Sequence, residues 1–459
     1  MLPTSYHAER ASGAENSRLR MFALGAILVL LHVTFLFWII PMLTTHLGPS
    51  DNHEHFPDGY DGLANSLVNG SGYRFYPDTA LTLMREPGFP LFLAGLFVCC
   101  GRSIIVVKLA NMIMAFVTAF IVVLISKRTL VPPFSQNRRF IVVPSVLFLL
   151  YPGTLIAESR GGVEIMFALM LTLYVLTIQV CISSNRLISY ATSGFVLGLT
   201  VLIRSTPLLF PIILLAFLVQ SRSVGIAKAG TLKGICIMMT VMAVVLSPWI
   251  IRNYRLTGAF VPTASVFGIS AQAGQYIGAH LFEGRPMWLL DREASRVRDG
   301  IAEQLGYSFK DDGWGYYQAF YKTDDELRFS SHLSQLVLRE YRSNPWLFAR
   351  CTVENLVGFW VAGKTWRATA ANAVVQLPLL ALAITGSIHC WKIRKFRTVV
   401  PMVLIVVYVV AVHAPILAQA RYSIPLIPIV SVLATIGGYS LLSQWRKSDL
   451  KNVSMAQAS

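Results

Sequence analysis

The chain has 459 residues, of which 54% are hydrophobic and only 14% are charged. A soluble domain usually has about a quarter charged residues, so this composition excludes an ordinary soluble protein. The net charge of +16 would suit nucleic acid, but apolar segments divide the basic residues into short pieces, which excludes that partner.

Apolar runs recur along the whole chain and predict an all-α polytopic membrane protein with roughly ten crossings. The first run, Met21–Ile40, is about long enough to cross a bilayer as one helix, and we expect it to be a retained signal anchor. The other runs lie near residues 104–126, 140–157, 163–183, 188–220, 231–251, 373–391, 398–417 and 422–443.

Two further segments are ambiguous as membrane crossings. Phe89–Cys100 is only about a dozen residues long, which is short for a crossing, so we expect it to be partly inserted or re-entrant. Trp346–Val361 is read as a juxtamembrane element that lies in the interface.

The distribution of charge predicts the orientation. Of the 23 acidic residues, 17 lie in two segments, 41–88 and 251–345. The basic excess lies in short connectors, namely Arg10, Arg18, Arg20, Lys127, Arg128, Arg138, Arg139, Arg222, Lys228, Lys233, Lys392, Arg394, Lys395, Arg397, Arg446 and Lys447. The positive-inside rule places these connectors in the cytoplasm. We therefore expect cytoplasmic tails at 1–20 and 444–459, one membrane domain over 21–443, and outer loops at 41–88 and 251–345.

The first outer loop contains a predicted short amphipathic helix on the membrane surface. Its apolar residues fall at helical spacing: Leu63, Ala64, Leu67 and Val68. Pro57 favours a helix start, which would place Asp58 and Asp61 on one face. Gly70 and Gly72 are expected to end the helix.

Acidic residues in this loop are candidates for proton transfer. Carboxylates beside a bilayer suit proton abstraction because partial desolvation raises the pKa of a base toward working pH. The structural alternative is that Asp58 caps the helix and Asp61 is solvated, and spacing leaves both readings open. The cluster His53, Glu54 and His55 does not have the spacing of a helical zinc site, so we expect no metal there.

Four arginines are expected on the outer side. Arg204 lies within an apolar stretch, where an ionisable residue usually faces a cavity or a partner. Arg85, Arg252 and Arg421 lie at span ends. A single interfacial arginine is commonly a snorkelling anchor, but four opposite a carboxylate-bearing loop favour an anionic headgroup such as phosphate or pyrophosphate.

Two other outer features are less specific. Glu158 and Glu164 flank Arg160, and they could pair with Arg160 or Arg204 or contribute to the site, with pairing favoured. The loop 251–345 has eleven acidic and eleven basic residues together with many aromatic ones. It suits a folded cover or a sugar-binding surface.

The loop motifs resemble those of a known family. Asp58-Gly-Tyr, Ala64-Asn-Ser-Leu and Gly70-Ser-Gly-Tyr, followed by Arg85-Glu-Pro-Gly-Phe-Pro, resemble the first outer loop of bacterial membrane glycosyltransferases. These enzymes form the protein O-mannosyltransferase and aminoarabinose transferase superfamily, which has the C-type glycosyltransferase fold. Further agreement comes from Glu164 after Tyr151-Pro152, from Pro248-Trp-Ile-Ile-Arg252-Asn253-Tyr, and from Arg421-Tyr422 with Pro425 and Pro428.

The resemblance, which extends from about residue 20 to 440, implies a bundle of roughly 10–12 transmembrane helices with juxtamembrane helices in the first outer loop. It implies an enzyme of the bacterial inner membrane that moves a sugar from a polyprenyl-phosphate carrier to an acceptor hydroxyl on the periplasmic face, with inversion. The acceptor could be a lipid, a glycan or a protein. No cofactor is assigned, and dependence on a divalent metal is left open.

The resemblance also assigns roles to residues. Asp58 best matches the catalytic base, with Asp61 and Glu54 as alternatives. Arg85 is the first choice for the leaving phosphate, and Arg204, Arg252 and Arg421 are supporting phosphate-binding candidates. The remaining site candidates have supporting roles: Tyr60, Glu86, Glu164, Asn253 and Tyr422.

Two departures from the family pattern matter. Many relatives carry an Asp-Glu pair some four residues before the tyrosine, where this chain has Phe56. Where aminoarabinose transferases have Glu-Lys-Pro, this chain has Arg85-Glu86-Pro87, so the roles of the two charges could be exchanged.

The alternative from another class is a secondary transporter or translocase of a lipid-linked or anionic substrate. Arg204 within an apolar stretch and the many spans favour it. Against it, the sequence shows no inverted repeat, and its polar residues gather at one face rather than at the midplane.

Overall fold

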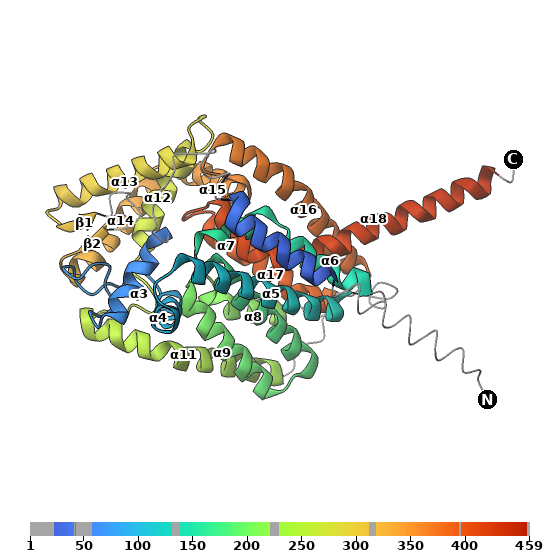
Figure 1. Ribbon diagram of the computed structural model, residues 1–459, viewed down its shortest axis with the longest axis horizontal. Coiled ribbons are helices and arrows are strands. Elements are labelled where there is room, and N and C mark those ends of the chain that lie inside the picture. The colour runs from blue at the N-terminus through green and yellow to red at the C-terminus, as the bar shows by residue number, and fades with distance from the viewer. Residues whose placement is uncertain are drawn as a thin grey trace.

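The computed structural model describes residues 23–40, 42, 57–130, 138–220, 229–311, 318–393 and 396–456. These ranges form helices joined by turns and loops, together with one small hairpin (Figure 1). Residues 1–20 and Glu54, for which the sequence made predictions, lie outside the described residues.

Five described helices are long and apolar enough to cross a membrane. They are α5 (Ile104–Thr129), α8 (Glu164–Ser184), α11 (Ala229–Thr257), α16 (Trp366–Lys392) and α18 (Ile427–Ala456), which continues from the 3₁₀ helix η6 (Ala420–Leu426). A sixth span is formed if α6 (Arg138–Leu149) and α7 (Pro152–Arg160) are taken together. These two helices meet at a bend of 49°, where Pro152 disfavours helical backbone at the residue before it.

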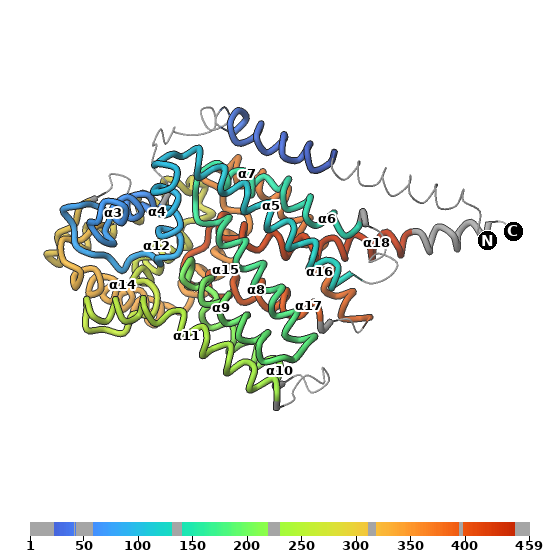
Figure 2. Tube along the Cα trace, turned by 60° about the horizontal axis from the view of Figure 1, so that its bottom comes forward, coloured from blue at the N-terminus to red at the C-terminus, as the bar shows by residue number. Residues whose placement is uncertain are grey.

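Shorter apolar helices complete the membrane part. They are the helix Ala23–Ile39, whose end is the π-helix η1 (Phe35–Ile39), then α4 (Gly88–Cys100), α9 (Leu187–Ile203), η4 (Thr206–Leu209) with α10 (Phe210–Gln220), and α17 (Phe396–His413). Figure 2 shows the first of these helices along one side of the bundle beside α7. The predicted all-α polytopic fold is confirmed, and the chain is an integral membrane protein.

Small residues bring the membrane helices together. A Cβ atom on Gly194 of α9 would lie 2.3 Å from the carbonyl oxygen of Met238 in α11. A Cβ atom on Gly437 of α18 would lie 1.9 Å from the carbonyl oxygen of Leu382 in α16. Helix association in a bilayer depends on such close van der Waals contact, because lipid tails are as apolar as the side chains. These glycines therefore fix the closest helix pairs of the bundle.

The predicted outer loop 251–345 is folded. It forms α12 (Phe267–His280), α13 (Met287–Gln304), the strands β1 (Phe309–Asp311) and β2 (Gln318–Phe320), and α14 (Thr323–Ser343). The strands pair antiparallel, with Phe309 opposite Phe320. Phe320 is buried against Phe329, so this aromatic residue belongs to the core rather than to a sugar-binding surface.

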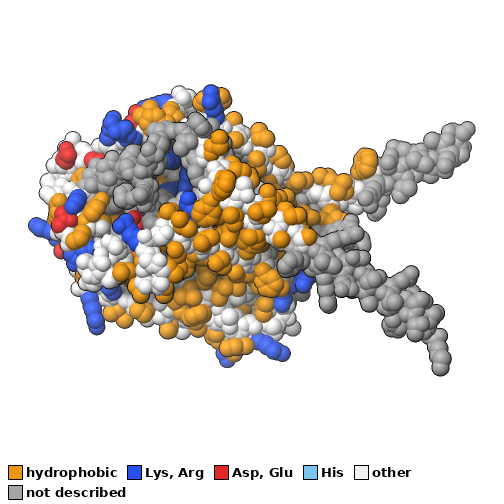
Figure 3. Space-filling view, viewed as in Figure 1, with side chains coloured by type: hydrophobic (Ala, Val, Ile, Leu, Met, Phe, Trp, Pro, Cys, Tyr) orange, Lys and Arg blue, Asp and Glu red, His pale blue; other side chains and the backbone are white. Residues whose placement is uncertain are grey.

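This folded layer forms one end of the molecule. In Figure 3 the acidic side chains visible on this face lie at that end, whereas the middle is mostly hydrophobic. The layer packs on the first outer loop and on α15 (Pro345–Val361). The segregation agrees with a membrane-embedded bundle that has a polar cap at one end.

The first outer loop contains the predicted short helix, α3 (Tyr60–Val68). Gly70 and Gly72 follow it with φ angles of 71° and 82°, values that favour glycine. The prediction that Asp58 and Asp61 share one helical face is wrong. Asp58 precedes the helix in the short turn η2 (Pro57–Gly59), with φ 67° and ψ 13°.

The two ambiguous segments are both helical. At 13 residues, α4 is about 20 Å long, shorter than a hydrocarbon core of about 30 Å. Its first residue, Gly88, touches α9, since a Cβ atom there would lie 2.7 Å from the carbonyl oxygen of Leu202. The second segment forms α15, whose N-terminus is capped by the side chain of Asn344. Whether either helix crosses the membrane stays a prediction.

Candidate functional site

Three arginines meet at the end of the bundle beneath the outer layer. Arg85 comes from the loop before α4, Arg204 from the turn between α9 and η4, and Arg421 from η6. They surround the carboxylates of Asp58 in η2 and Glu164 at the start of α8. We call these three guanidinium groups the arginine cluster. Segments far apart in the sequence therefore build one charged site.

Asp58 makes the closest contacts with this cluster. Its two carboxylate oxygens accept hydrogen bonds from Nη1 and Nη2 of Arg421, at 3.1 and 3.3 Å. Nη2 of Arg85 lies 4.0 Å from Oδ1 of Asp58, and Nε of Arg85 donates to the Asp58 carbonyl oxygen at 3.3 Å. The Arg421 contact is bidentate, the geometry that guanidinium groups also use with phosphate.

The backbone at Asp58 is held in an unusual conformation. Both Asp58 and Gly59 have positive φ angles, 67° and 72°. For a residue with a Cβ atom this region is sparsely populated and costs about 1–3 kcal/mol. The turn directs the Asp58 carboxylate to the arginine cluster before the chain enters α3.

Tyr422 lies between two members of the cluster. The guanidinium carbon of Arg204 is 4.9 Å from its ring centroid, and that of Arg421 is 5.2 Å away. Arg204 also contacts Glu164 at 3.5 Å, one of the pairings that the sequence left open. Cation–π contact and the carboxylate together stabilise two neighbouring positive charges.

Glu86 contacts the backbone beside Arg204. Its Oε1 accepts a hydrogen bond from the backbone N–H of Ser205 at 3.0 Å. The hydroxyl of Tyr73 donates to the carbonyl oxygens of Arg85 and Glu86, at 3.1 and 3.0 Å. Glu86 thus positions the turn that holds Arg204, while Arg85 is the charge that faces Asp58.

The electrostatic state of Asp58 differs from the expectation. Burial alone would raise its pKa, but Arg421, Arg85 and Arg204 together outweigh that effect and lower the pKa to about 2. The prediction that desolvation brings this base toward working pH is therefore wrong for the structure as it stands. Burial raises the pKa of the neighbouring Tyr60 hydroxyl, whose ring lies 5.9 Å from the guanidinium carbon of Arg85.

Arg252 and Asn253, two predicted site residues, contact each other near the end of α11, apart from the arginine cluster. Nη1 of Arg252 donates to the carbonyl oxygen of Thr82 and to Oδ1 of Asn253, at 3.0 and 2.9 Å. The guanidinium group also lies over the Trp249 ring, at 4.5 Å. Asn253 is fully buried and holds the turn after α11 by donating to the carbonyl oxygen of Val261. These contacts join α11 to the first outer loop rather than to Asp58.

Asp61, the alternative base, also lies apart from the cluster. Its Oδ2 contacts Nη2 of Arg102 at 2.7 Å, and the side chain of Arg102 is 48% exposed. Arg102 follows α4 in a polar turn, and the sequence analysis did not single it out. The position of Arg102 between two apolar segments was the sequence feature that could have indicated a role at the membrane surface.

Asp291 of α13 was not predicted from the sequence. Both of its carboxylate oxygens accept hydrogen bonds from Nε2 of Gln419, at 3.0 and 3.2 Å. Gln419 is two residues before Arg421, so Asp291 borders the arginine cluster. Asp291 was one of eleven acidic residues in the loop 251–345, and no local pattern distinguished it.

Metal binding has no candidate site in the described ranges, where no group of three or more His, Cys, Asp or Glu side chains could hold an ion. His53, Glu54 and His55 lie outside those ranges.

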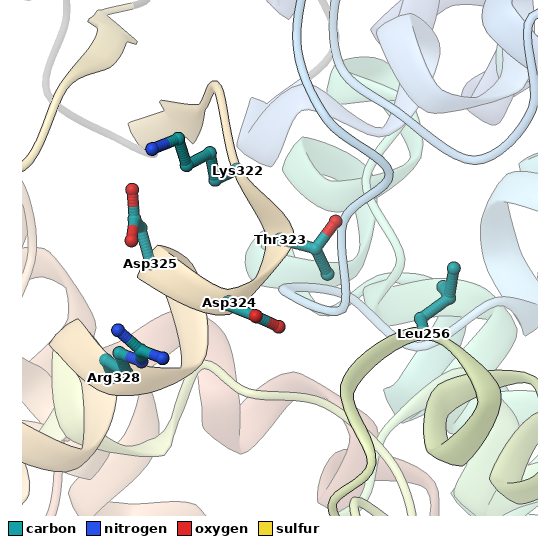
Figure 4. Close-up of a pocket in the computed structure, with 6 residues that line it drawn as sticks. All are labelled: Leu256, Lys322, Thr323, Asp324, Asp325 and Arg328. Carbon is teal, nitrogen blue, oxygen red and sulfur yellow. The ribbon is translucent and has the colours of Figure 1, made fainter.

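A separate polar pocket lies between the end of α11 and the start of α14 (Figure 4). It is lined by Leu256, Lys322, Thr323, Asp324, Asp325 and Arg328. None of the predicted site residues borders it. We therefore place the candidate site at the arginine cluster.

The fold is similar to that of solved membrane glycosyltransferases. The archaeal oligosaccharyltransferase AglB from Archaeoglobus fulgidus, in complex with an inhibitory peptide and a dolichol-phosphate, matches 95% of this chain with 14% identity and a TM-score of 0.54. The match covers 52% of AglB, so this chain spans about half of its length. ArnT from Cupriavidus metallidurans in the apo state matches 91% of this chain and 77% of its own, with 9% identity and a TM-score of 0.37.

No protein-family model and no curated protein matches the sequence. The likeness to AglB confirms the predicted C-type glycosyltransferase fold.

Proposed function

We propose that this protein is a glycosyltransferase that moves a sugar from a polyprenyl-phosphate-linked donor to an acceptor hydroxyl, with inversion. The observation that supports it best is the arginine cluster, in which Arg85, Arg204 and Arg421 surround the carboxylates of Asp58 and Glu164 at the end of a membrane bundle. The similar protein AglB is described with a dolichol-phosphate, a lipid phosphate of the same class.

The cluster has donors for a phosphate. The buried Nε of Arg421 has no hydrogen-bond partner in the described part of the chain. The side chain of Arg421 is 29% exposed, against 13% for Arg85 and 14% for Arg204. A donor phosphate would reach Arg421 first and would compete with Asp58 for its bidentate contact. Guanidinium groups preorganised in this way stabilise the charge that develops on a leaving phosphate.

Supporting residues keep the cluster in place. Glu86 holds the turn directly after Arg204 through the N–H of Ser205, Glu164 contacts Arg204 itself, and Tyr422 lies between two arginines. Tyr60 covers Arg85. Arg252 and Asn253 do not contact Asp58. They support the site indirectly, because they join α11 to the first outer loop.

Asp58 is the sequence-derived candidate for the base, and its role depends on the donor. While Arg421 and Arg85 contact it, its low pKa makes it a weak proton acceptor. A donor phosphate that draws these guanidinium groups away would raise the pKa of Asp58. In this proposal donor binding prepares Asp58 to take the proton of the acceptor hydroxyl.

The proposed placement follows the charge pattern. The membrane domain over 21–443 lies in a bacterial inner membrane, with the loops 41–88 and 251–345 and the arginine cluster on the periplasmic side. The tails 1–20 and 444–459 are cytoplasmic. The joint location of the cluster and of the folded layer α12–α14 at one end of the bundle supports this orientation.

Sugar transfer by the detergent-solubilised protein tests the proposal. A panel of radiolabelled polyprenyl-phosphate sugars is offered with membrane extract as the acceptor source, to the native chain and to Asp58→Asn, Arg421→Ala and the control Arg102→Ala. We expect transfer by the native chain and by Arg102→Ala, and its loss in the other two. Donor movement across vesicles without any sugar transfer would contradict the proposal in favour of a transporter.

A further inference from the structure

The end of α17 leads directly into the segment that carries Arg421. The carbonyl oxygen of His413, the last residue of the helix, accepts hydrogen bonds from the N–H groups of Ile416 and Leu417, both at 3.0 Å. The turn that follows is packed on α12, because a Cβ atom on Gly274 would overlap the carbonyl oxygen of Ile416. The backbone between His413 and Arg421 is therefore held closely, and His413 has a fixed place beside the site.

The imidazole of His413 is held in one orientation. Its Nδ1 lies 2.8 Å from the carbonyl oxygen of Val409, one turn earlier in α17. A carbonyl oxygen only accepts hydrogen bonds, so Nδ1 carries the hydrogen and donates. The ring centroid lies 5.5 Å from that of Phe359 on α15 and 5.3 Å from that of Tyr422 in η6, distances typical of aromatic contacts. The imidazole thus joins α15 and α17 to the ring of Tyr422.

Tyr422 connects this imidazole to two members of the arginine cluster. Its ring adjoins the guanidinium carbons of Arg204 and Arg421, at 4.9 and 5.2 Å, and its hydroxyl accepts a hydrogen bond from Nη2 of Arg421 at 3.4 Å. The attraction between a cation and a ring depends on where the cation lies over the ring face. A displaced Tyr422 ring would therefore displace both guanidinium groups. An uncharged imidazole suits the place beside this ring, because two positive charges already adjoin it.

We infer that His413 is a positioning residue of the transfer, whose imidazole fixes the Tyr422 ring and through it the places of Arg204 and Arg421. The inference rests on the proposed function and keeps Asp58 as its base. His413 acts on the donor phosphate only through Tyr422 and the two arginines. Preorganised charges stabilise a leaving phosphate without reorganisation during the step, and a displacement of about 1 Å lowers a rate by as much as about 10²-fold.

Two substitutions of His413 separate the ring from its hydrogen bond. His413→Phe keeps an aromatic ring and removes the donor, whereas His413→Asn keeps an amide donor near Val409 and removes the ring. We expect His413→Phe to keep kcat within about threefold of the native value, and His413→Asn to lower kcat and the affinity for labelled polyprenyl phosphate by about 10- to 100-fold. The KM for the acceptor should stay native in both variants, because the acceptor meets Asp58 rather than Tyr422. Equal kcat in the two variants would overturn the inference.

A double-mutant cycle tests whether His413 acts through Tyr422. Tyr422→Ala removes the ring that the imidazole fixes, so adding His413→Asn should lower neither kcat nor donor affinity any further. A loss by the same factor in the native chain and in Tyr422→Ala would overturn the inference. The matched control is His389→Ala, which changes a histidine in the last turn of α16 and should leave kcat unchanged in both backgrounds. Thermal unfolding in detergent gives one assay temperature at which all variants are folded.

These assays also separate the two proposals. If the native chain binds no polyprenyl phosphate and transfers no sugar, the proposed function fails. If the native chain does both, while His413→Asn keeps the native rate or loses the same factor in Tyr422→Ala, only the inference fails.

Discussion

Two buried carboxylates of the outer region show how a structural contact differs from a candidate site. Glu326 on α14 accepts hydrogen bonds from the Thr82 hydroxyl at 2.6 Å and from the Leu83 N–H at 3.0 Å, and also from the Ser265 hydroxyl. Asp58 instead faces the guanidinium groups of the arginine cluster. Burial raises the pKa of Glu326, whereas the arginines lower that of Asp58 to about 2.

The two carboxylates differ in whether charged groups around them remain available to a ligand. Glu326 is only 2% exposed, and three neutral donors from two segments satisfy it, so it fastens the first loop and the turn before α12 to α14. The Asp58 region is partly open at Arg421 and concentrates three positive charges around the two carboxylates of Asp58 and Glu164. Excess charge of one sign at a buried site is expensive unless an ion of opposite charge binds there. The comparison therefore predicts loss of function at one carboxylate and loss of stability at the other.

The largest effect is expected for Arg421→Ala. It removes the bidentate partner of Asp58 and the most exposed phosphate donor, so kcat should fall by about 10²- to 10³-fold. Arg421→Lys keeps the charge but not the paired donors and should retain part of the activity. Steady-state kinetics with a fixed acceptor measures both variants. Equal activity in Arg421→Lys and the native chain would show that the bidentate geometry is unimportant.

Glu326→Ala tests the structural side of the comparison. The Thr82 and Ser265 hydroxyls and the Leu83 N–H would lose their acceptor, which should lower the free energy of unfolding by about 1–3 kcal/mol. Thermal unfolding in detergent measures this change. Donor affinity of the protein that remains folded should stay native. A selective loss of donor binding without loss of stability would place Glu326 in the site.

Arg252→Ala sharpens the comparison between arginines. The variant loses a hydrogen bond to the Thr82 carbonyl oxygen and the contact over Trp249, which together should cost about 1–2 kcal/mol of stability. We expect donor affinity to fall less than in Arg421→Ala, because Arg252 lies apart from Asp58. Binding of labelled polyprenyl phosphate to both variants at one temperature below unfolding decides this. If both variants lose the same donor affinity, Arg252 belongs to the phosphate-binding site.

The smallest effect is expected for Arg102→Ala. This arginine pairs with Asp61, but its side chain is 48% exposed, and exposed ion pairs contribute about 0–1 kcal/mol. Transfer activity should remain within about twofold of the native value, because Arg102 lies apart from the arginine cluster. A factor of two in rate corresponds to about 0.4 kcal/mol in activation free energy. The same radiolabel assay measures it. A loss as large as that of Arg421→Ala would make the Asp61 pair part of the catalytic site.

The sequence alone determined the helical architecture and proposed candidate residues for the site. Continuous apolar runs predicted the spans, and helical spacing of Leu63, Ala64 and Leu67 predicted α3, because these features are local. The charge distribution indicated which loops gather acidic residues. The pairing of Glu164 with Arg204 was one of the pairings that the sequence left open, whereas Glu158 pairs with His32.

Only the tertiary structure decided which charges meet. Asp58 and Asp61 are three residues apart, yet one contacts Arg421 and the other Arg102. Asp291 reaches the site through Gln419, 128 residues away. The pKa of a carboxylate depends on burial and on charges within a few ångströms, and these follow from the packing of distant segments rather than from local sequence. For that reason the sequence named the residue types of the site, and the fold assigned their partners.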